Sequence, residues 1–311
     1  MSISNVIEIN NVSRHFGTVQ AVNDVSLAIR EGETLGLIGH NGAGKSTLFK
    51  MMLGLIPPSA GSILIHGTPV HGNAFRQLRR AIGYLPENLA FYDNLSGLET
   101  LQFFASLKGA SPDQCLPLLH QVGLAHAVKR RVDGYSKGMR QRLGFAQALL
   151  GKPRILFLDE PTNGLDPEGI REFYQQLHEL NDHGVTVVIT SHILSEIQER
   201  VQRLAVMKNG KLHALGTVQE LREDVDLPLA IQLQLQCPAQ ALQDVLDGAA
   251  IASLEMHGQT AMIHCHRAHK MDILRRINTL GDGVLDIIVR EPSLEDVFLG
   301  YRGQQPAAGN K

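Results

Sequence analysis

The chain has 311 residues, of which 43% are hydrophobic, and 29 basic against 31 acidic side chains give a formal net charge of -2 at pH 7. This length predicts one large domain and one small one, and the near-zero charge speaks against a broad nucleic-acid-binding surface. The sequence contains neither a run of about 18 apolar residues nor a basic-then-apolar leader, and Cys115, Cys237 and Cys265 are scattered, so we expect a cytoplasmic chain without a disulfide framework.

Short apolar segments bounded by turn residues dominate the sequence up to about residue 85 and predict β-strands. These segments are Val6–Ile9, Val25–Ile29, Thr34–Ile38, Ser62–Ile65 and Ile82–Tyr84. The segment Lys45–Leu55 instead has apolar residues at helical spacing. We therefore expect strands and tight turns around one helix in this part of the chain.

A glycine-rich loop joins the predicted strand Thr34–Ile38 to that helix. It has the pattern G-x-x-x-x-G-K-S, and its residues are Gly39, His40, Asn41, Gly42, Ala43, Gly44, Lys45, Ser46 and Thr47. The glycines let successive amide groups turn inward, where together with the helix N-terminus they form a concave anion site. The pattern predicts a bound nucleoside triphosphate, with Lys45 at the β- and γ-phosphates and the Ser46 hydroxyl on Mg²⁺. The alternative is an ordinary glycine turn.

The sequence turns helical from about Glu87 to Leu150. Helices are expected over Glu99–Lys108, Pro112–Val122 and Lys137–Leu150. The loop ahead of them contains Phe91 and Tyr92, which either form a docking surface for a partner or pack inward to hold the helices together. The basic residues of this part, namely Lys129, Arg130, Arg131, Arg140 and Arg142, are interpreted as solvated helix faces and not as a DNA-binding stripe.

Two adjacent acids follow the fully apolar strand predicted over 154–158. Asp159 is expected to hold Mg²⁺ through water, and Glu160 to polarise the attacking water. A solvated strand end is the alternative, but acids after so apolar a strand are better explained by a metal and a water. Strands and helices then alternate over 153–218, which predicts a parallel sheet.

The composition changes after about residue 220, where the order β-α-β-β-α-β suggests a small ferredoxin-like α+β domain. Its expected elements are strands at 229–236, 250–256, 260–266 and 283–290 and helices at 239–247 and 268–280. A short capped helix is expected at Pro292–Phe298. The predicted domains are thus residues 1–218 and 219–303, followed by a disordered tail at 304–311.

Histidines gather in the predicted strand 260–266 and just after it. His264, His266 and His269 are candidate ligands for copper or zinc, whereas Cys265 would face the other side of the strand. The alternative, which we favour, is a set of surface histidines on an exposed strand face.

The order of these motifs resembles that of the ATP-binding-cassette (ABC) ATPases. The loop at 39–47 is followed by Tyr135-Ser-Lys-Gly-Met139, by Asp159-Glu160, by Gly164-Leu-Asp166 and by Ser191-His192. The second of these is a variant of the family's LSGGQ signature, in which Ser136 can cap the following helix and Gly138 lets that helix approach a phosphate. The resemblance implies an α/β P-loop domain with a helical subdomain at about 87–150. It also implies a homodimer that holds two ATP, each between the loop of one chain and the signature of the other.

The resemblance assigns further residues. Phe16 occupies the position of an aromatic that stacks on adenine, with a core phenylalanine as the alternative. His192 is similar to a histidine that contacts the γ-phosphate, and Asp166 to an aspartate that couples the two sites. Glu87 stands where the family usually has glutamine, and its carboxylate can also ligate Mg²⁺.

A narrower resemblance concerns the branch of the family that serves drug, sodium and cofactor-maturation exporters. The stretches 39–45, 83–88, 107–110 and 135–142 are similar to the ATPase subunits of transporters that mature nitrous-oxide reductase. This resemblance implies an integral-membrane permease as partner and an extracytoplasmic copper-chaperone subunit reached through it, with the ATPase peripheral on the inner face of the membrane. The alternatives are another exporter of the branch and a soluble cassette protein acting on ribosomes or DNA. Soluble cassette proteins usually have tandem cassettes or a coiled-coil insertion, which this sequence lacks.

Overall fold

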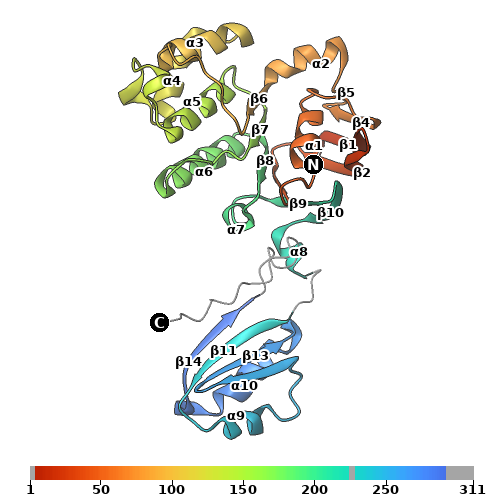
Figure 1. Ribbon diagram of the computed structural model, residues 1–311, viewed down its shortest axis with the longest axis vertical. Coiled ribbons are helices and arrows are strands. Elements are labelled where there is room, and N and C mark those ends of the chain that lie inside the picture. The colour runs from red at the N-terminus through yellow and green to blue at the C-terminus, as the bar shows by residue number, and fades with distance from the viewer. Residues whose placement is uncertain (1–3, 224–227, 292–311) are drawn as a thin grey trace. The chain divides into compact units, whose positions relative to one another are not determined.

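The computed structural model describes residues 4–223 and 228–291 (Figure 1). The chain divides into two compact units, residues 1–218 and 219–311, and each has its own hydrophobic core. Within the described ranges, no helix combines the length and the apolar character needed to cross a membrane. The helix expected at Pro292–Phe298 and the tail expected at 304–311 lie outside the described residues.

An antiparallel sheet with the strand order β2-β1-β4-β5 begins the first unit. Its strands are β1 (Asn5–Phe16), β2 (Val19–Arg30), β4 (Ala60–Ile65) and β5 (Thr68–Pro69). β1 and β2 form one long hairpin that turns at Gly17, where φ is 57°. Both strands extend well beyond the predicted segments 6–9 and 25–29, because their ends carry polar side chains that an apolar pattern does not detect.

A second sheet has the order β10-β9-β3-β8-β7-β6. Its strands are β3 (Thr34–Ile38), β6 (Ile82–Leu85), β7 (Ile155–Asp159), β8 (Thr186–Ser191), β9 (Arg203–Lys208) and β10 (Lys211–Gly216). The pairs from β9 to β6 are parallel, as predicted for 153–218. The prediction is wrong for β10, which pairs antiparallel with β9 through a turn whose residues Asn209 and Gly210 both have positive φ.

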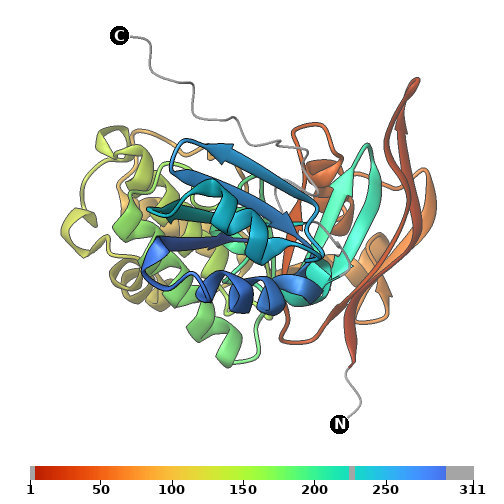
Figure 2. The same ribbon diagram turned by 90° about the horizontal axis from the view of Figure 1, so that it is seen from below.

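Helices surround this sheet (Figures 1 and 2). They are α1 (Lys45–Met52), α2 (Gly72–Leu78), α3 (Gly97–Lys108), α4 (Cys115–Gln121), α5 (Lys137–Leu149), α6 (Pro167–Asp182) and α7 (Leu194–Ile197). A further helix, α8 (Val218–Glu223), begins at the boundary between the two units. Turns of 3-10 helix lie at Arg79–Ala81, Pro112–Gln114, Ala125–Ala127 and Val132–Gly134. The expectation of one helix before residue 85 is wrong, because α2 forms with only Phe75 buried and so has no helical apolar face. The helix expected from Pro112 begins as a 3-10 turn.

The core of the first unit is built around α1. Phe49 of this helix contacts Phe157 of β7 edge to face, with ring centroids 5.2 Å apart, and Tyr84 of β6 at 6.3 Å. Both ends of the contact are fixed, since Phe49 and Phe157 are completely buried. The packing therefore holds the start of α1, and the glycine-rich loop before it, against the sheet that carries the two acids.

The second unit is an antiparallel sheet of order β12-β13-β11-β14 with two helices. Its elements are β11 (Leu229–Leu235), α9 (Ala239–Leu246), β12 (Ser253–His257), β13 (Thr260–Cys265), 3-10 turns at Arg267–His269 and Gly281–Gly283, α10 (Lys270–Asn278) and β14 (Val284–Arg290). This order and connectivity confirm the predicted ferredoxin-like arrangement. One face of the sheet packs on the helices, since β11 buries every second residue from Leu229 to Leu235 in one core with Leu242 of α9 and Ile273 of α10.

Candidate functional site

Three neighbouring parallel strands bring the predicted site together. β8 lies between β3 and β7, and both pairs are parallel, so the carboxyl ends of the three strands lie at the same edge of the sheet. The glycine-rich loop follows β3, Asp159 and Glu160 lie at the end of β7, and His192 follows β8. Residues from three distant parts of the sequence therefore lie at one edge of the sheet, where open α/β sheets bind their ligands.

The glycine-rich loop is shaped by glycines that no other residue could replace. A side chain at Gly39 would collide with the Met207 carbonyl, and one at Gly44 with the Ala21 carbonyl, while φ at these glycines is 155° and 100°. No described side chain caps the first turn of α1, so its amide groups point toward the loop. The loop thus has the backbone shape and the positive helix end that bind a phosphate group.

The Lys45 side chain folds back over the loop. Its Nζ donates to the carbonyl oxygens of Gly39 at 2.6 Å and His40 at 3.3 Å. Burial lowers the pKa of Lys45, whereas Glu160, Asp159 and Glu87 act in the opposite direction. Glu160, Asp159 and Glu87 are therefore near enough to Lys45 to favour the charged form of its ammonium group.

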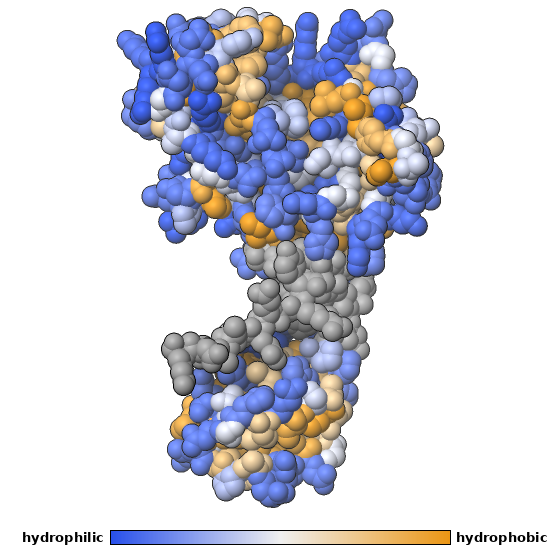
Figure 3. All heavy atoms as spheres, in the orientation of Figure 1, coloured by the Kyte–Doolittle hydropathy of each residue, from blue (hydrophilic) through white to orange (hydrophobic). Residues whose placement is uncertain are grey.

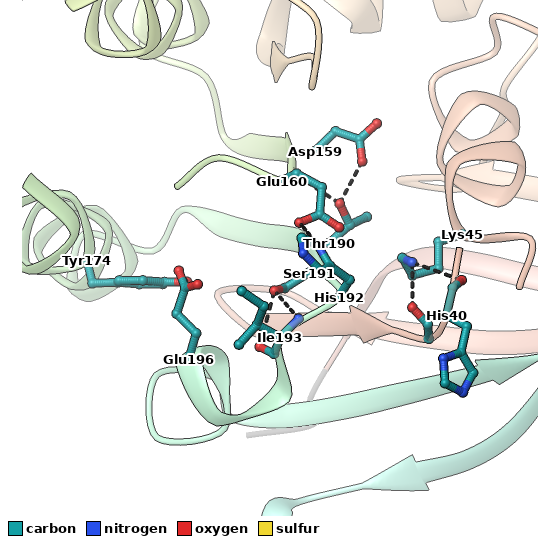
Figure 4. Close-up of polar contacts among 11 residues, drawn as sticks. His40, Lys45, Asp159, Glu160, Tyr174, Thr190, Ser191, His192, Ile193 and Glu196 are labelled. Carbon is teal, nitrogen blue, oxygen red and sulfur yellow. Dashed lines mark hydrogen bonds and ion pairs between the residues drawn. The ribbon is translucent and has the colours of Figure 1, made fainter. Parts of the chain in front are cut away.

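Thr190 at the end of β8 organises the two acids (Figure 4). Its hydroxyl donates to Asp159 Oδ1 at 2.6 Å and accepts from the backbone N–H of Glu160 at 3.0 Å. Thr190 is completely buried and both acids are nearly so. Buried carboxylates hold their charge only with hydrogen bonds or cations, so a solvated strand end, the alternative to a metal and water site, is wrong.

Glu160 and His192 form a close pair. His192 Nδ1 lies 2.8 Å from Glu160 Oε2, and Figure 4 shows the two side chains pointing toward each other. Burial raises the pKa of Glu160, and the hydrogen bond from His192 opposes that rise. Glu160 also has a left-handed backbone with φ of 48°, which a glutamate adopts at some strain. A buried carboxylate of raised pKa that is oriented by a histidine is suited to accept a proton from water.

The donor set fits a hard divalent cation. Asp159 supplies a carboxylate held by Thr190, and Ser46 an exposed hydroxyl in the first turn of α1. The exposed Glu87 lies close enough to act on both Lys45 and Tyr84, whose pKa is raised to about 12 by burial, Asp159 and Glu87. Oxygen donors of this kind are the ligands of Mg²⁺.

Phe16 is not a core residue, which excludes one of its two predicted roles. It ends β1 with 46% of its surface exposed, and the Arg14 guanidinium stacks over its ring at 4.7 Å. Arg14 covers one face of the ring, which leaves the other face for a flat ligand. Its contact with adenine stays a prediction.

The signature segment begins α5. Ser136 caps this helix by accepting from the Met139 N–H at 3.2 Å, as predicted. Tyr135, the departure from the usual leucine, is buried and donates to the Ala127 carbonyl at 2.8 Å. Figures 1 and 2 both show α5 among the helices of residues 97–149, away from α1. Within one chain, the signature and the glycine-rich loop therefore occupy separate places.

Gly138 packs against the segment that follows Glu160, and Asp166 stands at the end of that segment. Asp166 caps α6 by accepting from the Gly169 N–H at 2.9 Å. A Cβ built on Gly138 would lie 3.0 Å from the Gly164 carbonyl oxygen, so a small residue is needed there. The contact of Gly138 with a phosphate and the coupling role of Asp166 stay predictions.

Sequence reasoning missed the roles of Thr190 and Gln141. The amide of Gln141, buried in α5, donates to the Pro161 carbonyl at 2.7 Å and joins the signature helix to the residue after Glu160. Only their positions in the sequence could have indicated these roles. Thr190 lies two residues before His192, and Gln141 lies one helical turn after Lys137. Neither residue belongs to a phosphate-binding pattern.

The aromatic loop gives a mixed answer to its two predicted roles. Phe91 is half-buried and meets the ring of Phe104 of α3 edge to face, and Tyr92, which is 59% exposed, meets the ring of Phe103 in the same way. Inward packing is therefore wrong for Tyr92. Beside these rings a groove of about 300 Å³ is lined by Ile82, Tyr84, Phe104, Leu107, Lys108, Gln147 and Leu150.

The basic residues and the histidine cluster do not form separate sites. Arg140 pairs with Asp93 and Arg142 with Glu172, both at 2.8 Å, so these arginines are partly covered and not simply solvated. His264 instead contacts the Ser253 hydroxyl at 3.0 Å. Within residues 4–223 and 228–291, no group of three or more histidine, cysteine or acidic side chains is placed to hold a metal ion.

Comparison with known proteins agrees with this geometry. The family model described as "ABC transporter" matches residues 22–163. An uncharacterized ABC transporter ATP-binding protein of Bacillus subtilis (strain 168), YhcH, is 40% identical over 76% of this chain and 77% of its own length. The bacitracin transport ATP-binding protein BcrA of Bacillus licheniformis is 35% identical over 97% of this chain and 98% of its own.

Solved structures resemble the first unit. A structure of an ATP-binding subunit of an ABC transporter has a TM-score of 0.65 at 31% identity and covers 70% of this chain and 92% of its own. A dimeric ATP-binding cassette in a post-hydrolysis state, bound to ADP and Pi, has a TM-score of 0.63 at 26% identity and covers 68% of this chain and 98% of its own. The chain therefore belongs to the ABC transporter family, as one of its ATP-binding and ATP-hydrolysing subunits.

Proposed function

We propose that two copies of this chain hydrolyse ATP between them and so drive an integral-membrane permease. The hydrogen bond between Glu160 and His192, at the sheet edge that also carries the glycine-rich loop, supports this most directly. This hydrogen bond links a carboxylate that is suited to activate water to a histidine that is proposed to contact the γ-phosphate. In the proposed assembly the chain is cytoplasmic and bound to the inner face of the membrane through the permease.

The residues of one chain have distinct roles in the proposed reaction. Lys45 and the loop amides bind the β- and γ-phosphates, replacing the carbonyl contacts that Lys45 makes at 2.6 and 3.3 Å. Glu160 takes a proton from water as the water oxygen bonds to the γ-phosphorus and the bond to the ADP oxygen breaks. His192 orients Glu160 and, through its hydrogen bond, opposes the rise in the pKa of Glu160 that burial causes. Mg²⁺, held by Ser46, Asp159 and Glu87, would neutralise charge on the phosphate oxygens.

The second copy supplies the signature. In the proposed dimer, Ser136 and Gly138 at the start of α5 of one chain approach the nucleotide held by the other chain's Lys45 loop, and Phe16 stacks on its adenine. The separation of α5 from α1 within one chain supports this arrangement (Figure 1). Solved relatives include dimeric cassettes. Closing of the dimer would then do mechanical work on the permease.

The exposed apolar side chains on α3 and on the loop before it are the proposed docking surface for the permease. Tyr92, Phe103 and Leu107 are exposed there, and Figure 3 shows hydrophobic residues at the surface over α3. This surface is linked to the signature helix, because Asp93 pairs with Arg140 at 2.8 Å. A permease that moves the aromatic loop would therefore also move the start of α5.

The ATP sandwich is tested with Glu160→Gln. We expect this variant to bind ATP, to lose hydrolysis by about 100-fold or more, and to elute as a dimer on a sizing column with MgATP. Glu179→Gln, on the exposed side of α6, is the matched control and should hydrolyse ATP normally. Lys45→Ala should weaken nucleotide binding. A Glu160→Gln protein that binds MgATP yet stays monomeric would overturn the sandwich.

The link to the permease is tested with Arg140→Asp and Asp93→Arg. Each single reversal should leave the ATPase rate of the isolated chain within about twofold, because a partly exposed pair contributes only about 1 kcal/mol to stability. Each should reduce the stimulation of that rate by the reconstituted permease. The double reversal restores opposite charges and should restore stimulation; unchanged stimulation in both single variants would refute the link.

For the cargo, we propose maturation of the copper site of nitrous-oxide reductase, with a copper-chaperone subunit on the far side of the permease. The support is the similarity of the stretches 39–45, 83–88, 107–110 and 135–142 to such transporters. The second candidate is export of a peptide antibiotic or another drug, which is favoured by the near full-length similarity to a bacitracin transport protein.

One strain separates the two cargo proposals. Glu160→Gln is introduced into the chromosomal copy of a denitrifying host, and nitrous-oxide reduction, reductase copper content and bacitracin susceptibility are measured together. Lost reduction with reductase still made but poor in copper supports maturation. Intact reduction with raised antibiotic susceptibility supports export instead.

A further inference from the structure

The two edges of the second unit's sheet differ in character. β14 lies at one edge and β12 at the other. β14 exposes three apolar side chains, Leu285 at 58%, Ile287 at 41% and Ile288 at 40%, together with Asp286 and Arg290, whereas the exposed side chains of β12 are only Glu255 and His257. Charged groups protect an edge strand from pairing, and an apolar edge strand is ready to add another strand. β14 is therefore the edge on which a partner strand fits.

The backbone of β14 shows which groups face that free edge. The N–H of Ile287 donates to the carboxylate of its own neighbour Asp286 at 2.8 Å. On β11 the Gln236 N–H donates to Gly283 on the β14 side, so by alternation Gln234 and Gln232 face their partners Asp286 and Ile288. Ile287 and Val289 therefore direct their backbone groups away from β11 and form the row of donors and acceptors offered to a partner, whereas an irregularity of the pairing interrupts the alternation at Leu285.

The charges on β14 have twofold symmetry about Ile288. Asp286 lies two residues before it and Arg290 two residues after it. All three occupy the sheet face opposite the helices, because they pair with Gln234, Gln232 and Ala230 of β11, between the buried positions of that strand. An acid and a base equally spaced around an apolar residue are complementary to the same sequence running antiparallel.

We propose that β14 pairs antiparallel with β14 of a second copy of this chain, centred on Ile288. In this register Asp286 lies opposite Arg290 of the second copy, and Arg290 opposite its Asp286. Ile287 lies opposite Val289 of the second copy, and both have their backbone groups facing outward as a hydrogen-bonded pair requires. The Asp286 carboxylate, which covers the Ile287 N–H in the single chain, turns to Arg290 of the second copy.

Other registers do not match both charges. Centring the pair on Ile287 also brings outward-facing backbone groups together, but it places Asp286 opposite Ile288 and Leu285 opposite Val289. Directly opposed charges of opposite sign stabilise an antiparallel pair, whereas an acid opposite an isoleucine does not. The charge pattern therefore selects one register.

The expected contact is weak on its own. Pairing two strands of seven residues buries less than the roughly 1,200 Å² of a standard stable interface. Self-association through β14 does not require the ATP sandwich. Where the sandwich forms, a consequence that rests on the proposed function, the second contact becomes intramolecular and is strengthened by effective concentration.

Cysteine cross-linking of the full chain tests the register. Cys115 and Cys265 are buried, so Cys237→Ser gives a background without an accessible thiol in the described residues. Ile288→Cys should form a disulfide-linked dimer under mild oxidation, because directly opposed residues lie about 4.5 Å apart between Cα atoms. Leu285→Cys is the control on the same strand, since its two copies would lie about 20 Å apart. Cross-linking of both variants, or of neither, would overturn the proposal.

Charge reversal gives a second measurement. Without nucleotide, Asp286→Arg and Arg290→Asp should each weaken self-association in sedimentation velocity about tenfold, and the double variant should recover it. Glu255→Arg on β12 is the control and should change nothing. Unchanged association in both single variants would refute the pairing. Dimerisation of Glu160→Gln with MgATP is measured alongside, so that failure here is distinguished from failure of the ATP sandwich.

Discussion

Thr190 shows how much of the site depends on a single hydroxyl group. This group donates to Asp159 and accepts from the Glu160 N–H, so it fixes the proposed metal ligand and the proposed general base relative to β8. The hydrogen bonds span 31 and 30 residues of sequence. A side chain that orients other catalytic groups in this way affects activity without touching the substrate.

We predict that Thr190→Val lowers kcat for ATP hydrolysis by about 10- to 100-fold, because Asp159 and the Glu160 N–H both lose their partner. Thr186→Val is the control on the same strand, where the hydroxyl accepts from the Gly32 N–H at 2.9 Å. Each variant should lose about 1–3 kcal/mol of unfolding free energy. Steady-state kinetics and urea unfolding check this, and equal kcat losses in the two variants would contradict the assignment.

Lys108 in the groove beside the aromatic loop predicts a pH-dependent stability. Burial lowers its pKa to about 8. Below that value the folded chain keeps a poorly solvated charge, and as pH rises from 8 toward 10.5 the proton is released more easily from the folded than from the unfolded chain, so stability rises. We expect Lys108→Met to be about 1 kcal/mol more stable at pH 7, with a smaller difference at pH 9.5. Urea unfolding at both pH values measures it, with exposed Lys129→Met as control.

Residues of the site were predictable where they are contiguous in sequence. The glycine-rich loop and the pair Asp159-Glu160 each follow an apolar strand, so local pattern and geometry coincide. Thr190 and Gln141 were not predictable in the same way, because their partners lie 31 and 20 residues away. Only the fold of the sheet brings such residues together.

Among the elements, the start of α3 packs directly against Tyr135, the unusual residue of the signature. A Cβ on Gly97 would collide with the hydroxyl of Tyr135. That hydroxyl is the one that donates to the Ala127 carbonyl, so the space left by a glycine on α3 is filled by a hydrogen-bonded ring at the beginning of α5. This contact fixes two helices of the signature-bearing region relative to each other.

We predict a compensating pair at this contact. Gly97→Ala should destabilise the chain by about 2 kcal/mol through overpacking, and Tyr135→Phe by about 1–2 kcal/mol through loss of a buried hydrogen bond. In the double variant the ring no longer carries the obstructing oxygen, so the loss should be smaller than the sum. A double-mutant cycle of urea unfolding measures the coupling, and strict additivity would contradict the contact.

At the level of elements, apolar periodicity located the buried strands and missed the elements with few buried side chains. β3 and β7 are buried along their whole length, and their positions were predicted to within one residue. α2 buries only Phe75 and was missed, and the polar ends of β1 and β2 were left out of the prediction. Pairing with a neighbouring strand, and not burial, holds those ends.

The whole molecule has two hydrophobic cores, one in each compact unit. We predict two calorimetric unfolding transitions, because each unit buries its own apolar side chains. MgATP should stabilise only one of the two units, by about 2.7 kcal/mol at 100 times Kd, since the residues predicted to bind the nucleotide lie in the first unit. The Lys45→Ala variant is the control. A single transition that shifts as a whole would show that the units unfold together.

Hydrogen bonding within one chain also has a kinetic consequence for the pair of nucleotides. Gln141 ties the signature helix to the carbonyl of Pro161, the residue joined covalently to Glu160. In the proposed dimer, that helix touches one nucleotide while Glu160 acts on the other. A displacement of the helix at the first nucleotide would also move Glu160, the proposed general base, at the second nucleotide. The two turnovers would therefore not be independent. Velocity should then rise with ATP concentration along a sigmoid, with a Hill coefficient above one.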